Sequence, residues 1–366
     1  MSAPRPRLTL VTGLYDLARR EGGGGRRTPE DYLRAAGLVL GTDADLVCFA
    51  DPALAPGVEA ARRANGLAHR TRVIARALEE WPAHANLPAI AAARAAHPLR
   101  NGDPGKDTPL YTVLQWSKFA MVRAALEDDP FASHAAWIDF GLAAPAHAPA
   151  EVLVHPSTRV RLLVMRDLAA ARDAAADPVG YFTAIYGLVA AGYVSADRAH
   201  FARLSARFEA RSRALLAQGI AASDEQLLPV LAVEEPDLFE FYFGDYSHLL
   251  DNYAGLRGSG ENLLFQLRHA RAGEEWDHGL ALARALLAAL DAGRFAASST
   301  LLAQLLDECF LAAWYGEGPP HALAGEVAAR YAERLRADPE FRDVFLRSEI
   351  RVRSNFALLG SGAPAL

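Results

Sequence analysis

The first half of the chain alternates short apolar runs with longer stretches whose apolar residues recur at helical spacing. The apolar runs predict strands at Leu8–Thr12, Asp45–Phe49, Arg72–Ala75, Ala136–Asp139 and Val160–Met165. The helical stretches between them lie at Pro29–Leu40, Pro56–Asn65 and Tyr111–Glu127. Buried strands that alternate with amphipathic helices are typical of an α/β fold, so we expect a mostly parallel sheet flanked by helices.

The pattern changes after about residue 255, where Gly258-Ser259-Gly260 forms a cluster of helix breakers. Beyond it the chain is rich in Leu and Ala at helical spacing and predicts helices at Trp276–Ala292, Ala296–Trp314 and Ala322–Ala337. We therefore expect two domains, an α/β domain at residues 1–255 and a C-terminal α-helical region at residues 256–366. The apolar stripes of these helices need cover, which the α/β domain, a homodimer partner or an acceptor molecule can supply.

Composition indicates a globular protein with a substantial core. Hydrophobic residues make up 51% of the 366 residues, and the net charge of −6 argues against nonspecific binding to nucleic acid. The sequence has no secretory signal and no apolar run of ~18 residues, so we expect a cytoplasmic protein without a transmembrane segment, which leaves peripheral membrane contact open. Cys48 and Cys309 both lie in apolar strings and are predicted to be buried free thiols.

The segment Ala136–Gly141 is the main candidate for a site. Its apolar run ends in Asp139, and open α/β sheets bind ligands beyond the carboxyl ends of their strands. A carboxylate in that place can hold the divalent cation that neutralises a nucleotide diphosphate. The alternative is a strand followed by an ordinary turn, since Asp and Gly are common turn formers.

Lys118 is a charged residue among the apolar positions of the helix predicted at Tyr111–Glu127. It can pair with a phosphate as a point charge, or it can be a surface lysine whose aliphatic stem covers apolar neighbours.

Gly187 belongs to the small-residue stretch Ala184–Gly192. Its glycines allow a ligand to approach the backbone closely, and tight helix packing explains them equally well.

Asp224 and Glu225 stand together before an apolar run. Either can act as a general base or bind a sugar hydroxyl. The same segment predicts a helix start, with Ser223 as the N-cap and Gln226 completing a capping box. The two roles are compatible.

The segment Phe241–His248 is rich in aromatic residues, on whose faces sugars stack. His248 is a candidate metal ligand, although a lone histidine is more often structural.

Two segments rich in helix breakers are predicted loops. Gly22–Gly25 is flanked by arginines but lacks the spacing of a phosphate-binding loop. Asn101–Pro109 is either a lid or a plain connection.

The order of these segments resembles the HtrL/YibB (WlaTC-like) family of bacterial proteins, which are similar to glycosyltransferases of the GT-A fold. The resemblance covers roughly residues 8–255. Its motifs are Val11–Asp16, Asp31–Leu33, Leu46–Asp51, Tyr111–Lys118, Asp128–Phe131, Trp137–Gly141, Gly187–Gly192, Asp224–Gln226 and Phe243–Tyr246.

The resemblance implies a GT-A-like (Rossmann-like) domain that binds a nucleotide-sugar donor. Asp139 takes the place of the metal-binding Asp-x-Asp motif, but Trp137 stands where its first aspartate belongs. A site for Mn²⁺ or Mg²⁺ therefore needs another ligand, such as His248 or Asp245. The residues implied for donor binding are Thr12, Asp51, Lys118, Trp137 and Gly187, with Asp51 meeting the nucleoside and Lys118 the phosphates.

Two functions from different classes follow. The favoured one is a glycosyltransferase that moves a sugar from a nucleotide sugar to the hydroxyl of a glycan or small-molecule acceptor, in cell-surface glycan or natural-product biosynthesis. In it, Asp224 or Glu225 acts on the acceptor hydroxyl, and Asp139 holds the metal. The alternative is a catalytically inactive GT-A-like binding or scaffold protein that uses its helical C-terminal region.

Overall fold

The computed structural model divides the chain into two compact units. Unit 1 comprises Met1–Leu163 and Leu168–Phe241, and unit 2 comprises Val164–Asp167 and Tyr242–Leu366. The residues that the structure describes are 8–20, 28–101, 107–129, 132–142, 158–244, 246, 249–250, 252–253, 260–293, 295–318 and 321–347.

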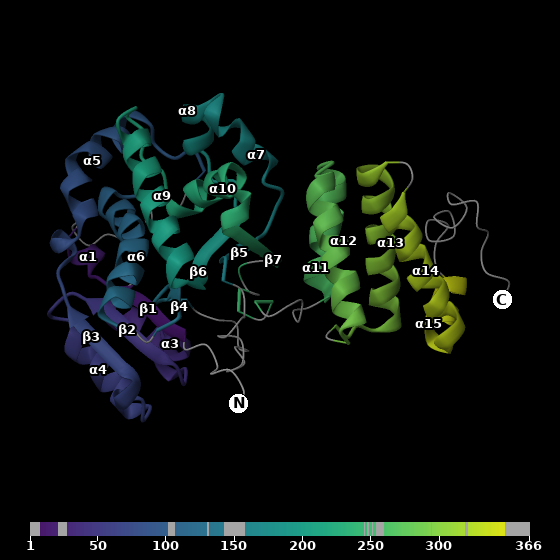
Figure 1. Cartoon of the computed structure of the whole chain (residues 1–366), viewed down its shortest axis with the longest axis horizontal. Helices are drawn as coiled ribbons and strands as arrows, with labels where there is room; N and C mark the ends of the chain where they lie inside the picture. The colour runs from purple at the N-terminus through teal and green to yellow at the C-terminus, as the bar shows by residue number, and fades with distance from the viewer. Residues whose placement is uncertain are drawn as a thin grey trace. The chain divides into compact units, whose positions relative to one another are not determined.

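A seven-stranded sheet has the order β3-β2-β1-β4-β6-β5-β7 (Figure 1). Its strands are β1 (Leu8–Leu14), β2 (Asp45–Ala50), β3 (Thr71–Ala75), β4 (His134–Ile138), β5 (Val160–Val164), β6 (Val189–Asp197) and β7 (Phe239–Phe243). The pairs β1–β2, β2–β3 and β1–β4 are parallel, and β6 runs antiparallel to β4. The mostly parallel sheet flanked by helices that the sequence predicts is confirmed.

The helices of unit 1 pack against this sheet. They are α1 (Leu17–Arg20), α2 (Pro29–Ala35), α3 (Gly37–Gly41), α4 (Ala55–Ala64), α5 (Leu87–Ala96), α6 (Pro109–Asp128), α7 (Ala169–Arg172), α8 (Pro178–Phe182), α9 (Arg198–Leu216) and α10 (Asp224–Glu234). Short 3₁₀ turns lie at Ala68–Arg70, Leu78–Glu80, Pro82–Asn86, Asp173–Ala175 and Pro236–Leu238. Helix α4 packs on β2 and β3, whereas α6 packs on β1 and β4 and also contacts α9.

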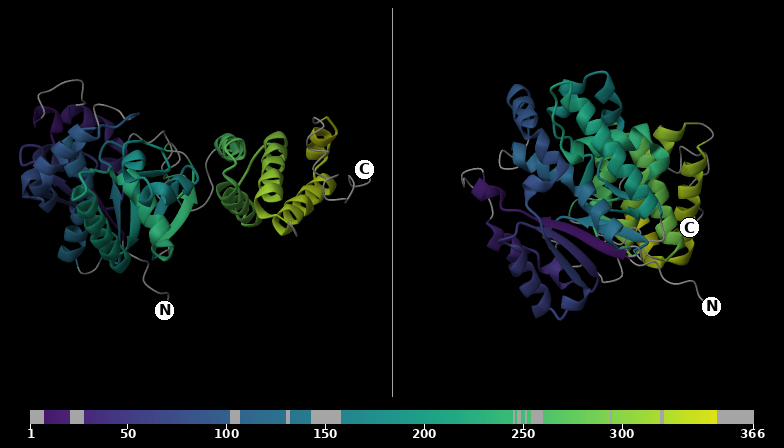
Figure 2. Two further views of the ribbon diagram at one scale, coloured as in Figure 1. Left: turned by 90° about the horizontal axis from the view of Figure 1, so that it is seen from above. Right: turned by 60° about the vertical axis from the view of Figure 1, so that its left-hand side comes forward.

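The strand order reverses between β1 and β4. The chain passes from β1 through β2 to β3, and then returns to β4 on the other side of β1. Helices α4 and α6, which belong to successive crossovers, lie on opposite faces of the sheet (Figure 2). Open α/β sheets bind ligands beyond the carboxyl ends of the strands at such a reversal of strand order.

Helix α6 is held from its first turn and is buried on most of its surface. The Thr108 side chain accepts a hydrogen bond from the Tyr111 backbone N–H, and Pro109 occupies the first helical position. Phe119 packs edge-on against Phe208 of α9, with 4.9 Å between the ring centroids. A helix this enclosed carries its polar side chains into the interior, and Lys118 is one of them.

Two predictions about local structure in unit 1 are wrong. The single helix expected at Pro29–Leu40 is the pair α2 and α3, which meet at Ala36 with a non-helical backbone. The segment from Val189 is the buried strand β6, so helix packing does not explain the glycine of its Ala190-Ala191-Gly192 run. These small residues have weak strand propensity, and only tertiary burial selects the strand.

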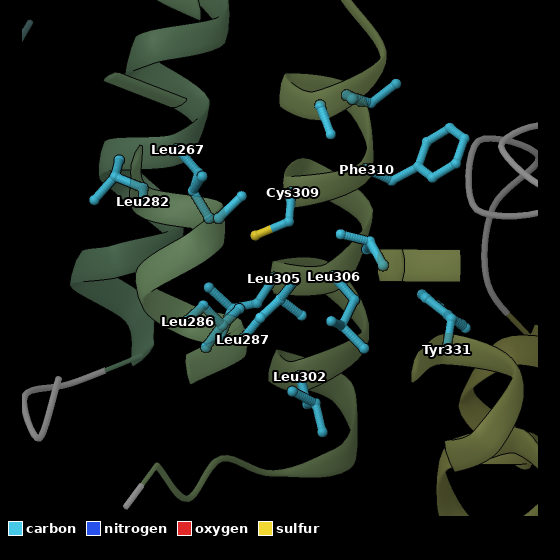
Figure 3. Close-up of a cluster of buried hydrophobic side chains, with 14 of the residues drawn as sticks. Leu267, Leu282, Leu286, Leu287, Leu302, Leu305, Leu306, Cys309, Phe310 and Tyr331 are labelled. Carbon is cyan, nitrogen blue, oxygen red and sulfur yellow. The ribbon is translucent and has the colours of Figure 1, made fainter. Parts of the chain in front are cut away.

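Unit 2 has a hydrophobic core of its own. The three helices predicted there are confirmed as α12 (Trp276–Asp291), α13 (Ser299–Glu317) and α14 (Ala322–Ala337). Two further helices, α11 (Gly260–Ala272) and α15 (Pro339–Arg347), were not predicted, and α11 begins at the last glycine of the predicted breaker cluster. Helix α13 contacts each of the other four, and Leu305, Leu306 and Cys309 lie in the core that they enclose (Figure 3). Cys48 and Cys309 are buried free cysteines, as predicted.

Arg62 ties α4 to the segment that leads from α3 into β2, and it generates a stability prediction. It is fully buried, and its guanidinium donates to the carbonyl oxygens of Leu40, Thr42 and Ala44 at 2.8–3.1 Å. We expect Arg62→Met to lower the free energy of unfolding by about 3 kcal/mol, because a buried carbonyl left unpaired costs ~1–3 kcal/mol. Urea denaturation measures the loss.

The matched control is Arg63→Met, since Arg63 is the exposed neighbour on the same helix. It should change the stability by less than about 0.5 kcal/mol. Equal losses in the two variants would show that the buried hydrogen bonds of Arg62 are not what stabilises this part of the sheet.

Candidate active site

Asp139 lies directly beyond the carboxyl end of β4, at the reversal of strand order. Its backbone N–H donates to the carbonyl oxygen of Gly192 at 2.9 Å, which continues the ladder between β4 and β6. Because β6 is antiparallel to β4, the amino-terminal half of β6 lies at this same edge. The edge therefore collects residues from β4, β6 and the helices that pack on them.

Lys118 of α6 is buried at this edge between two carboxylates. Its ammonium lies 2.6 Å from Asp224 Oδ2 and 2.9 Å from Asp139 Oδ1. The surface-lysine alternative is therefore wrong, because the side chain is only 6% exposed. Burial favours the neutral amine, but the Asp139 and Asp224 carboxylates outweigh it and hold the pKa of Lys118 above its ordinary value.

Asp224 is enclosed at the start of α10. Its Oδ1 accepts hydrogen bonds from Gln115 Nε2 and from the Glu225 backbone N–H, both at 2.9 Å, while Oδ2 binds Lys118. The side chain is 1% exposed. The predicted capping box of Ser223 and Gln226 is confirmed, and it fixes the helix start that carries Asp224.

Trp137, which stands where the resemblance places an aspartate, orients Asp139. Its indole Nε1–H donates to Asp139 Oδ1 at 2.7 Å, and the Lys118 ammonium lies 5.6 Å from the centre of its ring. The Asp139 side chain is 28% exposed. It is thus fixed on its inner oxygen and still accessible from outside.

Glu225 is the second half-buried carboxylate of the group. Burial raises its pKa from 4.5 to about 7, the Asp224 carboxylate adds to the rise, and a hydrogen bond with the Ala191 backbone opposes it. A carboxylate that titrates near neutral pH can take up a proton and release it under cellular conditions, which is what a general base requires.

Five residues predicted from the sequence thus form one group, which we call the Lys118 cluster: Lys118, Trp137, Asp139, Asp224 and Glu225. They come from α6, from the end of β4 and from the start of α10. Two of its members, Asp139 and Glu225, are accessible carboxylates, and the others hold them in place.

A family model described as "Bacterial protein of unknown function (HtrL_YibB)" matches residues 6–255, the span that contains the whole Lys118 cluster. The chain belongs to the HtrL/YibB family. No curated protein matches its sequence.

Among solved structures, the chain is similar to apo mouse xyloside xylosyltransferase 1. The two share 14% sequence identity, and the match covers 65% of this chain and 85% of that one with a TM-score of 0.38. A likeness this distant says nothing about function.

The site residues expected in the HtrL/YibB chain at β1 and β2 lie outside the cluster. Thr12 is fully buried in β1, where its hydroxyl has no hydrogen-bond partner among the described residues. Asp51 follows β2 and accepts hydrogen bonds from the Asp16 backbone N–H at 2.9 Å and from Arg20 at 2.6 Å. Arg20 also pairs with Glu79, so Asp51 belongs to a separate ionic group at the same edge of the sheet.

Gly187 precedes β6 and adopts a φ of +61°, where L side chains are strained. A Cβ atom built there meets nothing within 4 Å. The glycine therefore serves the turn of the chain into β6 rather than a close packing contact.

The described residues fit the expected Mn²⁺ or Mg²⁺ poorly. Asp139 is paired with the Lys118 ammonium, and both oxygens of Asp224 are already bonded. Within the described ranges, no group of three His, Cys, Asp or Glu side chains can hold a metal ion. Asp245 and His248 lie outside the described residues, as do the tetraglycine and residues 102–106, so the metal site stays a prediction. In the same described ranges, no helix is long and apolar enough to cross a membrane.

The sequence analysis did not single out Gln115, which binds Asp224. Gln115 precedes Lys118 by three positions on a helix, so the two side chains share one face. This spacing is a signal that identifies Gln115 once Lys118 is chosen.

Loss of the buried cation should destabilise the protein. We expect Lys118→Met to lower the free energy of unfolding by about 3–5 kcal/mol, because it leaves the carboxylate of Asp224 buried without its counter-ion. The double variant Lys118→Met/Asp224→Asn should recover part of that loss, since it also removes the buried negative charge. Urea denaturation of both variants measures the difference, and a double variant less stable than the single one would contradict the ion pair.

Glu225 should make the stability depend on pH. Its pKa rises from 4.5 to about 7 on folding, so the native state holds the proton more tightly than the unfolded state. The resulting stabilisation is complete below pH 4.5 and is lost as the pH rises to about 7. Wild type should therefore lose stability relative to Glu225→Gln across this range in denaturant titrations at several pH values.

The control for this pH effect is Glu59→Gln, since Glu59 is exposed on α4. Its stability should follow that of wild type at every pH. A constant difference between wild type and Glu225→Gln would show that the Glu225 pKa does not change on folding.

Proposed function

We propose that the chain is a glycosyltransferase that moves a sugar from a nucleotide-sugar donor to an acceptor hydroxyl. The observation that carries the proposal is the Lys118 cluster, in which a buried cation holds both Asp139, a partly exposed carboxylate beyond β4, and Asp224, the residue before Glu225. This is the place where α/β sheets of this topology bind nucleotides. Family membership is consistent with it and leaves the activity open.

Glu225 acts as the general base in this proposal. It takes the proton of the acceptor hydroxyl while the acceptor oxygen forms a bond to the anomeric carbon of the donor. The bond between that carbon and the diphosphate breaks, and the nucleoside diphosphate leaves with the electron pair. A pKa of about 7 allows Glu225 to accept a proton at neutral pH, and its half-buried side chain is accessible to a substrate.

Asp139 binds hydroxyl groups of the donor sugar. Trp137 and Lys118 fix its inner oxygen, which keeps the exposed part of the carboxylate in one orientation. Lys118 and Asp224 are positioning residues here, because their charged groups are enclosed by each other. This assigns Lys118 a different role from the phosphate contact expected from the sequence.

The alternative, an inactive binding protein, is favoured by the same ion pair. With Lys118 on Asp139, the carboxylate expected to hold a metal is neutralised. Binding of a nucleotide sugar does not separate the two functions, whereas turnover does.

The experiment combines binding and turnover. Wild type is melted with a panel of uridine, guanosine, cytidine and thymidine diphosphate or monophosphate sugars, with Mn²⁺ and separately with EDTA, and hydrolysis is followed as release of the free nucleotide. We expect at least one donor to raise the melting temperature, since a ligand at 100 times its Kd stabilises by about 2.7 kcal/mol. If none does so under either condition, the proposal fails.

The variant Glu225→Gln should keep the donor-dependent melting shift and lose about 10²–10⁴-fold in turnover, the usual contribution of a general base. In wild type the rate should rise with pH through about 7, as the carboxylate loses its proton, and this rise should be absent from the variant. Glu234→Gln, an exposed position on the same helix, is the control and should retain wild-type turnover.

A further inference from the structure

The loop between α8 and β6 is held in place by two segments distant in sequence. The side-chain amide of Asn101 donates to the Ile185 carbonyl oxygen at 2.9 Å and accepts from the Ile185 backbone N–H at 2.7 Å. Beside it, the Arg100 backbone N–H donates to Thr183 O at 2.8 Å, and its guanidinium donates to Gly180 O at 2.6 Å. These bonds fix the outer side of the loop.

The inner side of the loop is fixed by α10. Gln226 Nε2 donates to the carbonyl oxygens of Phe182 at 2.9 Å and Ala184 at 2.8 Å, and the Tyr181 hydroxyl donates to Gln226 O at 3.1 Å. Gln226 is the residue after Glu225. The loop is therefore attached to the helical turn that carries the proposed base (Figure 1).

An aromatic pair joins α8 to this loop. The rings of Tyr181 and Tyr186 are stacked, with 5.3 Å between their centroids and 15° between their planes. Tyr186 is 37% exposed. After it, Gly187 turns the chain at positive φ into β6, whose Ala191 backbone binds Glu225. The segment that carries the exposed ring is thus bonded to Gln226 at its start and, beyond its end, to Glu225 through Ala191 of β6.

We propose that Tyr186, supported by Tyr181, is a stacking platform for a pyranose ring of the acceptor, which makes the acceptor a saccharide or glycoside. This rests on the proposed transferase function. The apolar C–H face of a sugar ring packs on an aromatic face, and a tyrosine hydroxyl adds a hydrogen bond at the rim. A ring held by a loop with this many hydrogen bonds loses little entropy when a ligand binds, which favours affinity.

A platform role also accounts for the number of hydrogen bonds that hold this short surface loop. A tyrosine needed only to cover Tyr181 does not require its backbone to be fixed from Asn101 on one side and Gln226 on the other. A stacking platform requires a fixed backbone, because the distance between the platform and the base determines which hydroxyl of the acceptor reaches Glu225.

Saturation-transfer NMR with a panel of methyl glycosides and disaccharides, in the presence of the donor nucleotide, tests the platform. Wild type should transfer saturation to the ring protons of at least one glycoside. Tyr186→Ala should weaken that binding by about tenfold, equivalent to ~1.4 kcal/mol, and Tyr186→Phe should retain most of it. Tyr315→Ala is the matched control, because Tyr315 is also exposed and packs on another aromatic ring, that of Trp276.

Equal binding by wild type and Tyr186→Ala overturns the platform, and so does a panel in which no glycoside binds wild type. The donor-dependent melting shift is read in the same samples and separates the two proposals. Glycoside binding that depends on Tyr186 without any donor shift overturns the transferase and leaves the saccharide site. A donor-dependent melting shift, together with glycoside binding that is equal in wild type and Tyr186→Ala, overturns the platform and leaves the transferase.

Discussion

The buried ammonium of Lys118 is the interaction on which the site depends. It joins α6, the residue after β4 and the first turn of α10 through two ion pairs, and Gln115 adds a hydrogen bond between α6 and Asp224. Burying such a group is unfavourable, because taking a charge out of water costs several kcal/mol. Proteins in which apolar residues replace a buried ion pair are often at least as stable as the original. Stability alone therefore does not account for the cluster. The need to orient Asp139 and Glu225 accounts for it, because the two carboxylates lie on separate segments that would otherwise move independently.

The features that the sequence predicted correctly are those encoded locally. Alternation of apolar runs with helical spacing was sufficient for β1 to β5 and for α12, α13 and α14 of unit 2, and the Ser223 capping box was visible within four residues. The position of Asp139 followed from one further rule, that ligands bind beyond the carboxyl ends of strands. Each of these signals depends only on residues that are close together in the sequence.

The partners within the site were not predictable in the same way. Lys118 and Asp224 are 106 positions apart, and no local pattern predicts that the lysine of α6 will pair with the carboxylate of α10. Strand β6 was missed for a related reason: its Ala-Ala-Gly start has weak strand propensity and becomes a strand only between β4 and β5. In the sequence Trp137 is a departure from the metal-binding motif, whereas in the structure its indole N–H binds Asp139, the aspartate of the motif that is present.

The charges at this edge are unevenly distributed, and this constrains how a donor can lie. One ammonium faces two carboxylates in the Lys118 cluster, and Glu225 adds a third acidic group. Beyond β2 and β3, Arg20 likewise faces two carboxylates, Asp51 and Glu79, but Arg76 adds a second positive charge 3.8 Å over the Trp81 ring. A diphosphate is repelled by the first group and attracted by those arginines. On the proposed function, the nucleotide therefore lies toward β2 and the sugar toward Asp139.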